Sequence, residues 1–203
     1  MMQDVASGRG NLGRTLETAQ CAGAVQPGTH HLKRLMSNEF RRKRGFSPVL
    51  IAGIAAMCVA VMGGLLTEIG PWYKGLLQPA FKPPDAWFGP IWTLIFILAA
   101  AAGAVAWKQA PDRASRYWLV GLFALNAGLN SLWSWLFFKL QRPDWALLEV
   151  GFLWLSIAAL MWAMKSYARR SSALLLPYLL WVSFAIAINY ATVQLNGPFS
   201  RPF

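Results

Sequence analysis

Long apolar segments alternate with short polar breaks along most of this chain. Five segments reach the roughly 20 apolar residues that a helix needs to cross the hydrocarbon core of a bilayer. They are residues 47–69, 88–107, 117–138, 145–164 and 173–195. The breaks between them are short and carry prolines or charges, so neighbouring helices must run antiparallel. The pattern predicts an all-α fold, an integral membrane bundle of five transmembrane helices.

Composition agrees with a membrane protein and argues against a soluble one. Of the 203 residues, 56% are hydrophobic and only 13% are charged, whereas a soluble domain carries about 25% charged residues. Of the net charge of +11, residues 1–45 contribute +5, and residues 46–203 contribute +6 from short clusters beside apolar segments. A nucleic-acid binder would instead gather its basic residues on one face of a soluble fold. We therefore expect the lipid bilayer, and no nucleic acid, as a partner.

Residues 1–45 differ from the rest of the chain. They are polar and basic, and they mix Gly, Ser, Thr and Arg without a helical or strand period. This predicts a disordered N-terminal extension, followed by the transmembrane domain over residues 46–203. An organelle transit peptide is an alternative, although Asp4, Glu17 and Glu39 weaken it. An extension that precedes a start at Met36 is another.

Little in the sequence points to catalysis or to a metal. Cys21 and Cys58 lack the spacing of a metal or redox site, and both histidines, His30 and His31, fall in the N-terminal extension. Glu149 is the one acid placed away from the last residues of a predicted span, since Glu68 stands at the end of the first. Such a residue is a functional candidate, but near a helix N-terminus it can also reach the membrane interface, where the helix dipole favours it. We predict no catalytic residue, no metal site and no obligate cofactor.

The connection after the first span is stiff and aromatic. Pro79, Pro83 and Pro84 each fix their own φ and restrict the residue before them. Its large aromatic residues, which are costly to leave in water, are Trp72, Tyr73, Phe81 and Trp87. We expect this connection to pack over the helix ends as a lid. A simple anchor at the membrane interface is the alternative.

The third span has two contrasting faces. Asn126, Asn130 and Ser134 are spaced four residues apart and share one face, where each Asn needs a polar partner. The partner could be a polar group on another helix or a ligand. A third alternative is that one Asn bonds to another helix while the other faces a ligand. Ala124 and Gly128 lie about 200° around the helix. This small pair predicts a homodimer interface, with packing inside the same chain as the alternative.

Aromatic residues form pairs at helical spacing in two other spans. Trp92 and Phe96 are one turn apart in the second span, and Trp181 and Ala185 are one turn apart in the fifth. Pro177, one turn before Trp181, predicts a kink that makes room. Flat aromatic walls suit a flat macrocyclic ligand. Packing in the core of the bundle is the alternative.

Three ordered motifs carry a resemblance to a known family. Residues 72–92, WYKGLLQPAFKPPDAWFGPIW, resemble the first loop and second-helix start of the TspO/MBR family, also called the tryptophan-rich sensory protein, translocator protein or peripheral benzodiazepine receptor family. Residues 125–138, LNAGLNSLWSWLFF, resemble its third helix. Residues 176–185, LPYLLWVSFA, resemble its fifth. The resemblance covers about residues 46–198 and leaves the N-terminal extension outside.

The resemblance implies a five-helix bundle, usually dimeric, with a pocket beneath the first loop. It implies binding of porphyrins such as protoporphyrin IX and haem-like tetrapyrroles, in transport, scavenging or stress signalling. A transporter of another small hydrophobic or sterol-like substrate is the alternative, and some members bind sterols or benzodiazepine-like drugs. Carried over by motif position, the expected ligand-binding residues are Tyr73, Pro83, Phe88, Trp92, Phe96, Asn126, Asn130, Trp133, Ser134, Trp181 and Ala185.

The chain departs from the family pattern at one place. Members proposed to bind cholesterol carry a basic residue directly after a Tyr near the end of the last helix, whereas Tyr190 is followed by no basic residue before Arg201. We therefore rank sterols below porphyrins. Light-driven breakdown of a bound porphyrin by Trp92 and Trp181 is a further hypothesis, although we expect no enzyme. We expect a bacterial membrane, with an organelle outer membrane as the alternative.

Overall fold

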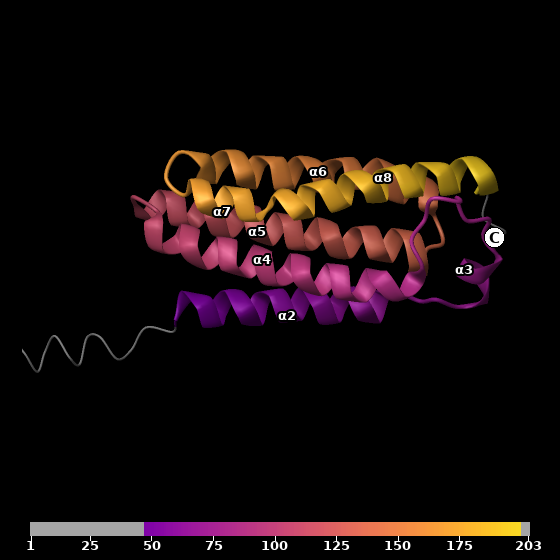
Figure 1. Cartoon of the computed structure of the whole chain (residues 1–203), viewed down its shortest axis with the longest axis horizontal. Helices are drawn as coiled ribbons and strands as arrows, with labels where there is room; N and C mark the ends of the chain where they lie inside the picture. The colour runs from indigo at the N-terminus through magenta and orange to yellow at the C-terminus, as the bar shows by residue number, and fades with distance from the viewer. Residues whose placement is uncertain (1–46, 200–203) are drawn as a thin grey trace, which may run out of the picture. The chain divides into compact units, whose positions relative to one another are not determined.

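The computed structural model describes residues 47–199, and this part of the chain is a bundle of long helices (Figure 1). Five helical spans in it are long and apolar enough to cross a membrane, and they cover residues 48–66, 85–109, 113–139, 143–165 and 169–196. The predicted all-α bundle of five transmembrane helices is therefore confirmed. The predicted extension over residues 1–45 lies outside the described residues.

The spans are built from both long and short helical elements. In chain order the elements are α2 (Pro48–Leu66), α3 (Pro71–Gly75), η1 (Asp85–Trp87), α4 (Phe88–Gln109), α5 (Arg113–Ser134), η2 (Trp135–Lys139), α6 (Pro143–Lys165), α7 (Arg169–Leu174) and α8 (Leu176–Asn196). Proline occupies the first or second position of α2, α3, α6 and α8. Its missing N–H is not needed there, because the first turn of a helix has no acceptor for it.

The third span begins earlier than the apolar pattern predicts and changes its winding near the end. Asp112 caps α5 by accepting a hydrogen bond from the Ser115 N–H at 2.7 Å, so the helix begins at Arg113. After Ser134 the chain makes one wide π-helical turn, η2, which is a feature often found at functional sites. This turn carries Phe137, which is buried, into the site described below.

The fifth span is broken at the position where the sequence predicts a kink. Helix α7 ends at Leu174 and α8 begins at Leu176, so Pro177 stands in the first turn of a new helix. The Leu175 N–H bonds to the Ser172 carbonyl at 3.1 Å across the break. The Ser172 hydroxyl in turn donates to the Met161 carbonyl on α6 at 2.9 Å. The helix is thus interrupted at the single residue Leu175, two residues before Pro177.

The core lies where α6 packs between α5 and α8, and the outer surface is apolar. Ile157, Leu160 and Met164 of α6 are fully enclosed, whereas α2 contributes no buried residue and lies along α4 at the edge of the bundle (Figure 1). Large apolar side chains point outward along every span, among them Trp162 with an exposed fraction of 81%. Lipid tails solvate such a surface, so the apolar exterior fits the bilayer.

Candidate functional site

A cavity of about 340 Å³ lies inside one end of the bundle. Residues from α2, α4, α5, α6 and α8 line it, and residues 70–87, which we call the lid, contribute Tyr73, Gln78, Lys82 and Asp85 to its wall. Helix α3 and the loop after it lie across this end of the bundle (Figure 1). The volume falls within the range of about 300–1,000 Å³ for pockets that hold small molecules. The packing of the lid confirms that it covers the helix ends.

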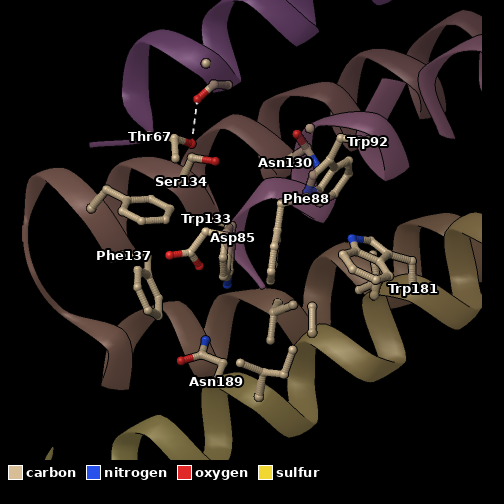
Figure 2. Close-up of a pocket in the computed structure, with 18 of the residues that line it drawn as sticks. Thr67, Asp85, Phe88, Trp92, Asn130, Trp133, Ser134, Phe137, Trp181 and Asn189 are labelled. Carbon is tan, nitrogen blue, oxygen red and sulfur yellow. Dashed lines mark hydrogen bonds between the residues drawn. The ribbon is translucent and has the colours of Figure 1, made fainter. Parts of the chain in front are cut away.

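Most of the ligand-binding residues that the sequence predicts meet at this cavity. Those that line it are Tyr73, Phe88, Trp92, Phe96, Asn130, Trp133, Ser134, Trp181 and Ala185. Figure 2 shows side chains from several helices pointing into the shared space. Pro83 and Asn126 are not among the lining residues. The role of each lining residue toward a ligand stays a prediction.

Two stacked aromatic pairs form flat parts of the cavity wall. Trp92 stacks on Phe96 within α4, with ring centroids 5.4 Å apart and planes 28° apart. Trp133 stacks on Phe137 from η2, with centroids 5.2 Å apart and planes 29° apart. Because these rings contact one another, they hold each other in place. The wall they make is therefore rigid and suited to a flat apolar ligand.

Trp181 stands on α8 and closes another part of the wall. Its ring lies edge-on to Phe88, with centroids 5.4 Å apart. The Trp181 indole N–H is buried and finds no hydrogen-bond partner within residues 47–199. A buried donor without a partner is costly.

The two asparagines of α5 have different surroundings. Asn126 donates to the Ser156 hydroxyl on α6 at 2.8 Å and accepts from the Tyr178 hydroxyl on α8 at 3.2 Å. Asn130 donates to the same Tyr178 hydroxyl at 3.3 Å and also lines the cavity. Asn126 therefore joins α5, α6 and α8, and of the two asparagines only Asn130 lines the cavity.

Hydrogen bonds and an ion pair hold the lid. The Tyr73 hydroxyl donates to Asp85 Oδ1 at 2.9 Å, and Lys82 forms an ion pair with the same oxygen. Burial raises the pKa of Tyr73 above its ordinary value, so the phenol remains a donor. Farther along, the Leu77 N–H donates to Asn196 Oδ1 at 2.8 Å, and Asn196 Nδ2 donates to the Leu77 carbonyl at 2.9 Å. These contacts tie the lid to the end of α8.

Several lining residues were missed by the sequence analysis. The polar and charged ones are Thr67, Gln78, Lys82, Asp85, Thr93, Asn189 and Thr192. Asn189 follows Trp181 and Ala185 at the same four-residue spacing, a signal that could have revealed it. In the amide orientation that satisfies both of its polar atoms, Asn189 donates from its nitrogen to the Pro143 carbonyl at 3.0 Å. Its oxygen accepts from the Leu147 N–H at 3.1 Å.

Glu149 does not reach the membrane interface, so that interpretation is wrong. Its exposed fraction is only 6%, and neither carboxyl oxygen has a hydrogen-bond partner in the described part of the chain. Glu149 lies two turns before Ser156, which bonds to α5, so the two share a helix face that points into the bundle. The helix face, rather than the nearness of the helix end, decides where the carboxyl group lies.

The small pair predicted for a dimer interface lies on the outside of the bundle. Ala124 and Gly128 are both exposed on α5. A Cβ atom placed on Gly128 would meet no atom of another helix within 4 Å among residues 47–199. Within this part of the chain, Gly128 therefore packs against no other helix. The homodimer itself stays a prediction.

Comparison with known proteins gives consistent similarities. The model of the TspO/MBR family matches residues 50–195. The chain is 38% identical over 152 residues to the tryptophan-rich protein TspO of Archaeoglobus fulgidus, and the aligned region covers 73% of this chain and 97% of that protein. It is 28% identical over 157 residues to the translocator protein of Sus scrofa, and the aligned region covers 74% of this chain and 93% of that protein. Neither of these two names describes an enzyme.

Proposed function

The chain belongs to the TspO/MBR family of multi-pass integral membrane proteins, and we propose that it binds a porphyrin in the cavity beneath the lid. The observation that carries the proposal is the cavity itself. It is partly open, mostly apolar and walled by Trp92, Trp133 and Trp181. A planar macrocycle gains from stacking and edge contacts with such rings. Protoporphyrin IX and haem-like tetrapyrroles are the ligands we expect.

The few polar groups in the wall would fix the orientation of the macrocycle. Asn130 lies at the cavity wall with an amide hydrogen bonded to Tyr178, and Ser134 lines the wall one turn farther along α5. Pockets for small molecules commonly combine an apolar lining with a few placed polar groups. We propose that binding serves tetrapyrrole transport, scavenging or stress signalling.

We propose a binding protein rather than an enzyme. The relatives are named as translocator or tryptophan-rich proteins, and neither name describes an enzyme. Light-driven breakdown of the porphyrin by Trp92 and Trp181 remains a hypothesis. Illumination of the complex tests it, because unchanged porphyrin absorbance relative to the free ligand would exclude it.

We also propose a homodimer through the outer face of α5. Ala124 and Gly128 are exposed on this face and carry small side chains or none. Small residues let helices approach closely in membranes. Cysteines introduced at these two positions, in a chain whose native Cys21 and Cys58 are replaced by Ser, should capture a dimer by oxidation in membranes. Failure to capture any dimer at either position would count against this interface.

A titration tests the porphyrin proposal. Protoporphyrin IX is added to detergent-purified protein while tryptophan fluorescence is followed, with wild type compared to a double variant carrying Trp92→Phe and Trp181→Phe. The matched control carries Trp118→Phe and Trp162→Phe, because these indoles are 72% and 81% exposed on the outside of the bundle. We expect saturable quenching that weakens only in the cavity variant.

The opposite outcome is equally clear. Binding that is absent, or that both double variants leave unchanged, would remove the porphyrin from this cavity. Movement of a hydrophobic substrate across proteoliposomes would then favour the alternative, a transporter of another small hydrophobic or sterol-like molecule.

A further inference from the structure

The charged side chains at the cavity belong to the lid. Among the described residues that line the cavity, Lys82 and Asp85 are the ones that carry a charge. They flank Pro83 and Pro84, which stiffen the backbone between them. Asp85 is also where the second membrane-spanning segment begins. The two charges therefore lie at the mouth of the cavity, at the boundary between the apolar bundle and the polar surroundings.

Lys82 faces inward and Asp85 faces outward. The Lys82 side chain has an exposed fraction of only 10%, whereas that of Asp85 is 42%. The ammonium nitrogen lies 5.4 Å from the centre of the Tyr73 ring and 5.7 Å from that of Phe88. Contact with the faces of aromatic rings stabilises a cation. Lys82 is thus a positive charge held in a fixed place beside the cavity wall.

The ammonium group retains hydrogen-bonding capacity. It carries three N–H donors, and its ion pair within the described residues is with Asp85 Oδ1. That oxygen also accepts from the Tyr73 hydroxyl at 2.9 Å, so Asp85 divides its charge between two donors. Burial lowers the pKa of Lys82, but its contacts with Asp85 and Tyr73 outweigh this and keep the pKa above its ordinary value. The group therefore stays charged at neutral pH.

We propose that Lys82 recognises a carboxylate on the cavity ligand, which makes the site selective for a planar apolar ring that bears an acid group. This inference rests on the proposed function, and it adds which chemical group of the ligand the protein recognises. The ring would lie among the aromatic residues of the cavity, and the acid would lie at the mouth. The free-energy cost of placing an anion is lower there than in the apolar interior, because the anion contacts a cation and lies near the interface.

Asp85 acts against the ligand in this arrangement. Its carboxylate occupies one donor of Lys82 and repels a second anion nearby. Removal of the Asp85 charge should therefore tighten the binding of an acidic ligand, while removal of the Lys82 charge should weaken it. The two neighbouring substitutions thus have opposite expected effects, which a general loss of lid structure cannot imitate.

Protoporphyrin IX and its dimethyl ester provide a matched pair of probes, because they share one ring and differ only in their capped carboxyl groups. Binding of both is measured by fluorescence quenching in a neutral detergent with wild type, Lys82→Met, Lys82→Arg and Asp85→Asn. We expect Lys82→Met to weaken binding of the acid roughly tenfold or more, the size of a charge-assisted hydrogen bond, and to spare the ester. Lys82→Arg should retain the preference, and Asp85→Asn should increase it.

The outcomes separate this inference from the proposed function. If Lys82→Met weakens the acid and the ester equally, or affects neither, carboxylate recognition by Lys82 is wrong while porphyrin binding stands. If Asp85→Asn weakens binding of the acid more than binding of the ester, the proposed competition between the two carboxylates is wrong. If wild type binds neither probe, the proposed function fails and this inference fails with it.

Discussion

Asn126 is the polar centre of the bundle, and its replacement gives the sharpest test of the helix arrangement. Its amide donates to Ser156 on α6 and accepts from Tyr178 on α8. Asn126→Ala removes both bonds, whereas Ser156→Ala removes only the first. The two single variants and their combination form a double-mutant cycle, which isolates the energy of the Asn126–Ser156 hydrogen bond.

The expected magnitude follows from the number of bonds lost. Hydrogen bonds between helices in membranes average about 0.6 kcal/mol and reach about 1.7 kcal/mol. Loss of the bonds at 2.8 Å and 3.2 Å should therefore lower the free energy of unfolding of Asn126→Ala by about 1–3 kcal/mol. The coupling between Asn126 and Ser156 should be about 0.6–1.7 kcal/mol. Tyr178 keeps its contact with Asn130 in every variant.

Reversible unfolding in mixed micelles, followed by tryptophan fluorescence, measures these energies. The same variants should bind protoporphyrin IX within about twofold of wild type, which is less than 0.5 kcal/mol, because Asn126 does not line the cavity. A coupling energy near zero would refute the hydrogen bond between α5 and α6. A large loss of porphyrin affinity in Asn126→Ala without a loss of stability would refute its place outside the cavity lining.

Three further predictions follow from other contacts. Asn196→Ala should speed amide hydrogen exchange at Leu77 and porphyrin dissociation, because it removes both bonds that tie the lid to α8; unchanged exchange would show that the lid is held elsewhere. Glu149→Gln should leave the free energy of unfolding unchanged or raise it, because the carboxyl group has no partner in the described residues; marked destabilisation would contradict this. Gly103→Val should destabilise the bundle by about 1–3 kcal/mol through overpacking, because even a Cβ atom there would stand 3.4 Å from the Phe123 ring; wild-type stability would contradict that packing.

Much of the fold follows from the sequence because a bilayer imposes a simple rule. Each apolar segment must be a helix long enough to cross, since every backbone polar group needs a partner within the segment. Part of the site could also be predicted from the sequence, because residues four apart share a helix face. That rule alone groups Trp92 with Phe96 and Trp181 with Ala185, and all four line the cavity.

The features that the sequence did not reveal depend on contacts between helices. The spacing of Asn126 and Asn130 makes them equivalent within α5, and only the positions of Ser156 and Tyr178 separate a structural role from one at the cavity. Glu149 lies near a helix end in sequence, but its helix face points inward. The single π-helical turn after Ser134 has no pattern of hydrophobic residues to announce it.

The central claim is that the ligand lies inside the bundle beneath the lid. A crystal structure of the protein with zinc protoporphyrin IX, solved with the anomalous signal of the zinc, tests this directly because the signal marks the centre of the ring. We predict one zinc position per chain within the cavity that Trp92, Trp133 and Trp181 line. A zinc position on the outer surface, for example in the shallow groove that Ile91, Pro177 and Phe184 form between α4 and α8, would contradict the account.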